Sequence, residues 1–297
     1  MSTQARPPVV SRLTTTSFRA MKEAGKAIVM VTAYDFNSAR LVEAAGLDAI
    51  LVGDSMGMTV MGESSTLPVT VDDIVRATRS VSRATQRVLV VADMPFMSYQ
   101  ADYVEGMHNA GRLLSEGGAQ AVKVEGATGS TLTLIKGLVG AGIPVQGHIG
   151  LTPQSVHTLG GYRTQGKDAP GATALVLSAL ALQDAGCFSL VLECVPLELA
   201  EKITAMLSIP TIGIGAGVGC DGQVQVFHDL LGLGDFTPRH AKRYANLDEE
   251  TTRAMRAYAD DVRNHVFPGE PQSTHVDPAV LADVSSRLEE SLSTAGE

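Results

Sequence analysis

The sequence is short of the features that define several classes of protein. It contains no tryptophan, only 4% of its 297 residues are aromatic, and its three cysteines show no CxxC spacing. These values argue against an aromatic ligand platform and against a disulfide framework. No apolar run approaches the roughly 20 residues of a membrane-spanning helix, and the first residues lack the apolar stretch of a secretory signal. We therefore expect a cytoplasmic protein that does not associate with membranes.

The chain also contains fewer basic than acidic residues. Lysine and arginine total 23 against 32 acidic residues, which gives a formal net charge of −9. A chain with this balance repels a polyphosphate, so we expect no nucleic-acid partner. Apolar residues, by contrast, make up 44% of the chain, and there are 30 glycines, which is enough for a sizeable core and for many tight turns.

The clearest pattern is a repeated unit of a short apolar run, a polar or glycine-containing turn and a longer stretch with helical spacing of apolar residues. Uninterrupted apolar runs are typical of parallel strands that are buried on both faces. The eight runs are 28–33, 49–53, 88–92, 121–124, 143–147, 188–192, 209–214 and 224–227. This repetition predicts a single-domain α/β protein, a (β/α)8 barrel of the TIM type.

Stretches with helical periodicity lie between most of these runs. They are 37–45, 71–84, 99–116, 132–141, 172–185 and 197–207. Thr70 precedes one of them and is followed by acidic residues, which predicts an N-cap there. Between the last two runs, residues 215–223 are fewer than the roughly dozen of a normal parallel crossover. Either a strand is misassigned or the seventh crossover is short and degenerate, and the regularity of the other units favours the second explanation.

The C-terminal part of the chain has a different character. The stretch after His228 is mostly helical by its pattern, and we expect it to complete the outer ring of the barrel. We therefore place the catalytic barrel domain, with its N-terminal segment, at residues 1–267. Beyond it the composition turns to proline, serine, glutamate and glycine, so we expect residues 268–297 to form a partly flexible tail with one short helix at 277–292.

The active site of such a barrel lies at the C-terminal ends of its strands. Four of the predicted strands end in Asp54, Asp93, Glu125 and Glu193. Taken singly, each is more simply explained as a helix N-cap or a turn residue. Taken together, four converging carboxylates would repel one another unless a cation were present, and carboxylates without neighbouring histidine or cysteine clusters suit Mg²⁺. The set therefore predicts a magnesium site.

Other residues at these strand ends offer further chemistry. Lys123 lies two residues before Glu125, so strand alternation points both side chains to the same side, where Lys123 would hold a substrate oxygen or form a structural ion pair. Glu193 opens the loop LECVP and is placed to act as a general base. His148 orients substrate or carries a proton, or it is a structural histidine. The glycines at 213–217 are better explained by a tight turn than by phosphate binding, because no basic residue is near.

Six stretches, taken in order, resemble the motifs of one family, the ketopantoate hydroxymethyltransferases. They are VGDSMGM (52–58), ADMPFMSY (92–99), VKVEG (122–126), GHIGLTPQSVHTLGGYRTQG (147–166), LECVP (192–196) and IPTIGIGAGVGCDGQVQVFHDLLGL (209–233). The resemblance runs from about residue 12 to residue 265, and the short seventh crossover has the spacing of the family motif.

The resemblance implies a magnesium-dependent barrel enzyme of pantothenate biosynthesis. Such an enzyme transfers a hydroxymethyl group from 5,10-methylenetetrahydrofolate to 3-methyl-2-oxobutanoate (α-ketoisovalerate) and so makes 2-dehydropantoate (ketopantoate). By this resemblance Asp54 and Asp93 bind Mg²⁺, and Glu125 completes the metal site directly or through water. Members of the family form homo-oligomers, decameric in many cases, so we expect a homo-oligomer here.

The resemblance also implies roles around the substrate. Glu193 would be the catalytic base. The residues expected to bind the keto acid, or to shape its pocket, are Asp54, Ser55, Asp93 and Lys123, with Tyr34 and His148 as further pocket residues. The loops 57–68 and 150–168 are rich in glycine, threonine and proline and are longer than their neighbours, so we expect them to cover the site and exclude water.

Two other readings of the sequence compete with this one. Related barrels include magnesium-dependent carbon–carbon lyases and mutases that act on acids resembling phosphoenolpyruvate or oxaloacetate. Those enzymes generally carry a KKCGH-like cysteine loop, whereas this chain has GHIGLTPQ at the corresponding place. From a different class, a non-catalytic ligand-binding barrel with carboxylates as helix caps would show no dependence on a metal.

Overall fold

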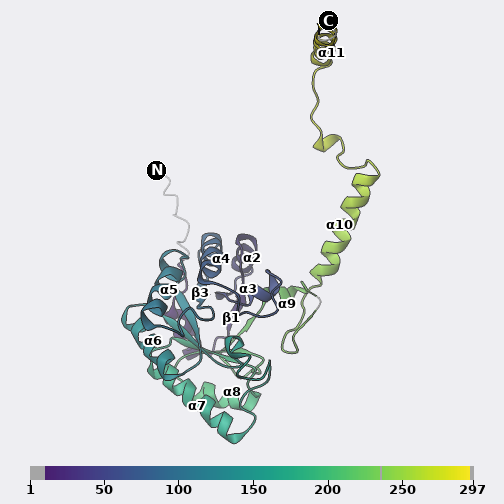
Figure 1. Ribbon diagram of the computed structural model, residues 1–297. Coiled ribbons are helices and arrows are strands. Elements are labelled where there is room, and N and C mark those ends of the chain that lie inside the picture. Colours follow the sequence, from purple (N-terminus) through teal and green to yellow (C-terminus); the bar gives the residue numbers. More distant parts are fainter. Residues whose placement is uncertain (1–10, 235, 295–297) are drawn as a thin grey trace, which may run out of the picture. The chain divides into compact units, whose positions relative to one another are not determined.

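The computed structural model describes residues 11–234 and 236–294, and its central feature is a closed barrel of eight parallel strands (Figure 1). Spatial order follows chain order, and the last strand pairs with the first. The strands are β1 (Ile28–Thr32), β2 (Ala49–Val52), β3 (Leu89–Asp93), β4 (Ala121–Glu125), β5 (Val145–Gly150), β6 (Ser189–Glu193), β7 (Thr211–Ile214) and β8 (Gly222–Gln225). The predicted (β/α)8 barrel is confirmed.

Strand β3 shows why the strands are apolar without interruption. Val90 belongs to the core layer between the strands and the surrounding helices, whereas Leu89 and Val91 belong to the cluster that fills the barrel interior. Both faces are buried, so both faces are apolar. The N-terminal end of the interior is closed by α1 (Thr15–Glu23), whose Phe18 ring lies 5.8 Å from the ring of Phe188, just before β6.

Helices alternate with the strands along most of the barrel (Figure 1). They are α2 (Phe36–Ala44), α4 (Val71–Ala84), α5 (Tyr103–Ser115), α6 (Gly129–Gly140), α7 (Ala169–Asp184) and α8 (Leu197–Met206), with the shorter α3 (Met56–Thr59), the 3₁₀ helix η1 (Pro153–Ser155) and α9 (Phe227–Leu231). Helix α4 has the predicted bounds. Its N-cap Thr70 and Asp73 form a capping box, in which each side chain accepts a hydrogen bond from the other residue's backbone N–H.

The helix expected at 99–116 begins later than predicted. Helix α5 starts at Tyr103, and the side chain of its N-cap Asp102 accepts a hydrogen bond from the N–H of Glu105. Tyr99 lies before the helix and is buried, with its hydroxyl bonded to the backbone of Glu125. The apolar spacing that extends the helical pattern back to Tyr99 therefore reflects burial of a loop against the strand ends.

The seventh crossover is as short as predicted. Residues 215–221, all within the described chain, connect β7 to β8 without a helix, and the two strands still pair in parallel. Strand β8 begins at Gly222, two residues before the predicted start. Both predicted strands are therefore present, the last one ending at Gln225 and not at Phe227, which begins α9, and the crossover is degenerate.

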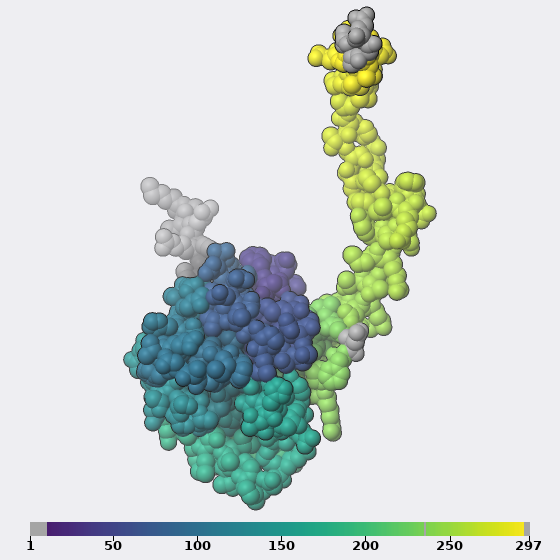
Figure 2. All heavy atoms as spheres, viewed as in Figure 1, coloured from purple at the N-terminus to yellow at the C-terminus, as the bar shows by residue number. Residues whose placement is uncertain are grey.

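The chain divides into two compact units between Ala245 and Asn246. The barrel is the first. The second contains α10 (Leu247–Arg263), the 3₁₀ helix η2 (Glu270–Gln272) and α11 (Pro278–Thr294). Helix α10 has no buried residue (Figure 2). That this stretch completes the outer ring stays a prediction.

The helix predicted at 277–292 is present as α11. The extent of the catalytic domain to residue 267 stays a prediction. No helix in the described ranges is long and apolar enough to cross a membrane.

Candidate active site

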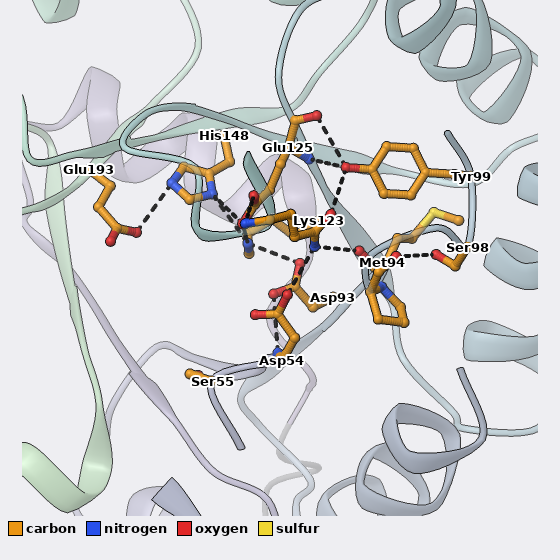
Figure 3. A network of polar contacts seen from close by, with 12 residues as sticks. Asp54, Ser55, Asp93, Met94, Ser98, Tyr99, Lys123, Glu125, His148 and Glu193 are labelled. Atoms are coloured by element: carbon orange, nitrogen blue, oxygen red, sulfur yellow. Dashed lines mark hydrogen bonds and ion pairs between the residues drawn. The ribbon is translucent and has the colours of Figure 1, made fainter. Parts of the chain in front are cut away.

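The acidic residues predicted at the strand ends come together at the C-terminal mouth of the barrel (Figure 3). In β3 and β4 the inward positions alternate, so Leu89 and Val91 are followed by Asp93, and Ala121 by Lys123 and Glu125. Asp54 follows the end of β2, and Glu193 ends β6. A cavity of about 1200 Å³ is lined by all of these acidic residues and Lys123.

Lys123 forms the electrostatic centre of this mouth. It is 4% exposed, and its Nζ lies 2.9 Å from Asp93 Oδ1 and 3.4 Å from Glu125 Oε1. Burial alone would lower the pKa of Lys123, but the surrounding carboxylates outweigh burial and raise it above its usual range. Lys123 is therefore a fixed buried cation. The inward direction of Lys123 that strand alternation predicts is confirmed. The side chain both pairs with the acids and lines the cavity.

His148 connects two of the carboxylates. Its Nδ1 lies 3.2 Å from Glu125 Oε1 and its Nε2 lies 3.3 Å from Glu193 Oε2 (Figure 3). Burial and the nearby Lys123 act to lower the pKa of His148, but Glu125 and Glu193 act against them and raise it to about 9. Glu125 in turn has its pKa held below the usual value, because Lys123 and His148 outweigh its burial.

Asp54 is the least compensated acid of the group. It is 4% exposed, and burial, followed by repulsion from Asp93 and Glu125, raises its pKa well above the usual value. The buried cluster contains three carboxylates, those of Asp54, Asp93 and Glu125, against the two basic side chains of Lys123 and His148. The mouth thus carries an excess of negative charge in a place that water reaches poorly.

This donor set fits a hard divalent cation that keeps most of its ligands as water or substrate. In the described part of the chain, no three acidic, histidine or cysteine side chains form a ready cage for a metal. Magnesium does not need one, since it commonly takes one or two carboxylates. Both oxygens of Glu125 are already engaged, one by Lys123 and His148 and the other by the N–H of Gln154. Asp93 is also contacted at both oxygens, by Lys123 at 2.9 Å and more weakly by the N–H of Asp54 at 3.4 Å. Asp54 is therefore the carboxylate best suited to direct ligation, and Asp93 lies beside it.

Two residues of the mouth carry no role in the sequence-based prediction. The side chain of Gln154, in η1, donates hydrogen bonds to Asp54 Oδ2 and to the carbonyl oxygen of Met94, each at 2.9 Å. The Tyr99 hydroxyl lies 3.1 Å from Gln154 Oε1 and accepts a bond from the N–H of Glu125. Both residues lie within the family motifs at 92–99 and 147–166, but only the folding of the loops brings them close to the acids.

The predicted pocket residues Tyr34 and Ser55 lie together. The Tyr34 hydroxyl is 2.8 Å from Ser55 Oγ, and its ring stacks on the ring of His228 with centroids 5.7 Å apart. Ser55 lines the cavity. Burial raises the pKa of Tyr34, so the hydroxyl remains a neutral hydrogen-bonding group that holds Ser55 at the edge of the cavity.

The two loops expected to cover the site both line the cavity. Met58 and Thr66 come from the loop 57–68, and Tyr162 and Lys167 from the region 150–168. The loops meet where the Tyr162 hydroxyl lies 3.8 Å from Met58 Sδ. Gly215 and Gly217 also line the cavity, and both have positive φ, as a tight turn after β7 requires.

The barrel and its mouth define this protein as an enzyme of the (β/α)8-barrel class. Solved structures with the same fold include 2,3-dimethylmalate lyase, described as a member of the PEP mutase/isocitrate lyase superfamily, at a TM-score of 0.58 and 20% identity, covering 95% of this chain and 94% of that one. Phosphonopyruvate hydrolase in complex with oxalate and Mg²⁺ has a TM-score of 0.57 at 12% identity, covering 94% and 98%. At these identities the likeness concerns the fold alone.

The sequence comparisons are more specific. A family profile described as ketopantoate hydroxymethyltransferase matches residues 12–270. The 3-methyl-2-oxobutanoate hydroxymethyltransferase of Carboxydothermus hydrogenoformans is 54% identical over 273 residues, which is 92% of this chain and 99% of the relative. That of Enterococcus faecalis is 49% identical over 269 residues, or 90% and 98%. The chain belongs to the ketopantoate hydroxymethyltransferase family.

Proposed function

We propose that this enzyme transfers a hydroxymethyl group from 5,10-methylenetetrahydrofolate to 3-methyl-2-oxobutanoate, giving 2-dehydropantoate for pantothenate biosynthesis. Its relatives at 49–54% identity carry the name of this activity. One observation at the site carries the proposal. A partly exposed carboxylate, Glu193, faces the same cavity as the buried cluster of Asp54, Asp93 and Lys123. A 2-oxo acid with an acidic C3–H needs this combination of a base and an electrophilic site.

The proposal includes Mg²⁺ held by Asp54 and Asp93, with Glu125 acting through water. When bound, the metal would withdraw electron density from the oxygens of the oxo acid and so make its C3 proton easier to remove. The excess of buried carboxylates over basic groups supports this choice. Ser55 and Lys123 then remain to bind oxygens of the substrate.

The residues of the chain perform the proton transfer. Glu193 removes the C3 proton, and His148, 3.3 Å from it, holds the carboxylate in position. Lys123 stabilises the negative charge that develops on the enolate oxygen. The C3 carbon attacks the methylene carbon of the folate and forms a carbon–carbon bond. As this bond forms, one carbon–nitrogen bond of the methylene group breaks. Water displaces the second nitrogen and supplies the hydroxyl oxygen, while the C3 proton and one proton of water end on the two nitrogens of the tetrahydrofolate that leaves.

We also propose that the outer part of the cavity receives the folate. The volume of about 1200 Å³ exceeds what a five-carbon acid needs. Its lining combines apolar side chains, such as those of Leu197 and Pro238, with the cationic Lys167 and Arg239. Apolar walls suit a pterin ring, and cations suit the carboxylates of a glutamate tail.

A lyase or mutase activity is the second candidate, because enzymes of that superfamily share the fold. Residues 147–154, GHIGLTPQ, contain no cysteine for the loop chemistry of those enzymes. In its place η1 brings Gln154 to the mouth. A homo-oligomer and a cytoplasmic location complete the proposal as predictions from the family resemblance and from composition.

The decisive experiment combines purified protein, 3-methyl-2-oxobutanoate, 5,10-methylenetetrahydrofolate and Mg²⁺, with mass spectrometry of the products. We expect 2-dehydropantoate, and we expect its formation to stop on addition of EDTA and to resume with excess Mg²⁺. Formation that continues in EDTA would exclude the metal. Cleavage of the acid without any gain of a one-carbon unit would favour the lyase alternative.

A further inference from the structure

Gln154 contacts the ends of three neighbouring strands at once. Its side-chain amide reaches Asp54, after β2, and the carbonyl oxygen of Met94, after β3. Its backbone N–H donates to Glu125 Oε2, at the end of β4, over 3.1 Å. The side chain is 5% exposed. Burying a polar side chain costs free energy unless its hydrogen-bonding groups find partners. The groups of Gln154 do find partners.

The orientation of this amide is determined by its surroundings. The Met94 carbonyl and the Asp54 carboxylate only accept hydrogen bonds, so the nitrogen of the amide must face them. The Gln154 oxygen lies 3.1 Å from the Tyr99 hydroxyl and 3.0 Å from Gln100 Nε2, both of which donate to it. If the amide were rotated by half a turn, its oxygen would face the oxygens of Asp54 and Met94, and no hydrogen bond could form there. Gln154 is thus a directional support for one oxygen of Asp54.

The support falls on a buried acid that lies among other acids. Asp54 is 4% exposed, and the carboxylates of Asp93 and Glu125 lie beside it (Figure 3). Among the described residues, the amide of Gln154 is the side-chain donor bonded to its carboxylate. Holding Oδ2 fixes the rotation of the carboxylate, which leaves Oδ1 free to bind a ligand in the cavity.

We propose that Gln154 is a positioning residue for the metal-binding carboxylates. It fixes Asp54 through its side chain and Glu125 through its backbone. Because it belongs to the segment 150–168, which also supplies Tyr162 and Lys167 to the cavity, it anchors this covering loop to the acids. The inference rests on the proposed function, in that it assumes a divalent cation at Asp54 and Asp93.

The test measures the affinity of the metal-free full-length protein for Mn²⁺. The electron paramagnetic resonance signal of the free ion reports how much Mn²⁺ stays unbound. Gln154→Met keeps the volume and the backbone N–H to Glu125 but removes the amide. Gln154→Asn keeps an amide that is too short to reach Asp54. The matched control is Gln146→Met, because Gln146 is also a fully buried glutamine, bonded to Ser189 Oγ at 2.8 Å, and does not line the cavity.

We expect both Gln154 variants to weaken Mn²⁺ binding about tenfold or more, the usual effect of losing an outer-shell hydrogen bond. Gln146→Met should bind as the wild type does, and the rate of C3 deuterium exchange by the Gln154 variants should recover at saturating metal. Gln154 variants that bind Mn²⁺ normally, or a Gln146→Met variant that loses as much affinity, would overturn the inference alone. A wild-type protein that binds no Mn²⁺ would remove the proposed metal site and the inference with it.

Discussion

His148 Nε2 lies 3.3 Å from Glu193 Oε2, while the other nitrogen of the same ring lies 3.2 Å from Glu125 Oε1. One imidazole therefore joins the proposed base to the acids around Lys123. Glu193 lies apart from the proposed metal ligands and contacts them through His148, which is the arrangement a base needs if it is to stay off a metal.

Replacing Glu193 by glutamine should stop removal of the C3 proton, because the amide cannot accept it at a useful rate. We expect exchange of the C3 hydrogen of 3-methyl-2-oxobutanoate in D₂O to fall by a factor of about 10²–10⁴. Nuclear magnetic resonance would follow the exchange. Glu201→Gln, an exposed site on α8, is the matched control and should exchange normally. Exchange at the native rate in Glu193→Gln would remove Glu193 as the base.

Asp54→Asn should abolish metal-dependent activity and yet stabilise the metal-free protein. Asparagine still accepts the hydrogen bond of Gln154, but it removes one of three mutually repelling buried charges. We expect the unfolding midpoint in EDTA to rise by about 2–4 °C, the shift that about 1 kcal/mol produces in a domain of this size. Calorimetry measures it. A lower midpoint would mean that the Asp54 charge is not strained.

Lys123→Met should act in the opposite direction. Removing the central cation leaves Asp93 and Glu125 buried without their partner, which costs about 3–5 kcal/mol for a buried pair. Urea denaturation would detect the loss. Lys202→Met, at an exposed position of α8, should stay within about 0.5 kcal/mol of the wild type. If both variants unfolded alike, the ion pairs of Lys123 would contribute nothing to stability.

Gly150→Ala should disturb the catalytic mouth through the backbone. Gly150 has φ of +98°, and an added Cβ would collide with the carbonyl oxygen of Glu193. We expect a loss of more than about 1 kcal/mol in stability and a lower rate of C3 exchange, since the end of β6 must shift. Gly111→Ala, in α5 with free space around its Cβ, should instead stabilise by about 0.5–1 kcal/mol. Equal effects at the two glycines would contradict this explanation.

The sequence predicts the barrel and its acids for the same physical reason. Continuous apolar runs indicate strands buried on both faces, and the first polar residues after them lie at the mouth, as Asp54 and Asp93 do. Strand alternation adds the direction of Lys123, because only a period of two is involved. Local sequence patterns therefore predict the site residues that lie on a strand or directly after one.

Local sequence patterns do not identify the site residues that loops bring to the mouth of the barrel. Gln154 lies 100 positions from Asp54 in the chain, and nothing local distinguishes it from a solvent-exposed glutamine. Tyr99 continues the helical spacing of α5, so its position outside the helix depends on the hydroxyl contact with Glu125. Helix α10 shows a related limit, since amphipathic spacing indicates an apolar face but does not identify the surface that covers it.

The helix-free connection from β7 to β8 gives the barrel wall a seam. Only Ile212 and Gly213 of β7 pair with β8, whereas all residues of β6 from Leu190 to Glu193 pair with β7. Amides along this seam should exchange hydrogen with solvent before those of the central strands, since local opening follows the sparsest bonding. The proposed metal ligands and base lie elsewhere on the wall, from the end of β2 to β6, so opening at the seam should disturb the cavity wall at Gly215 and Gly217 before it disturbs them.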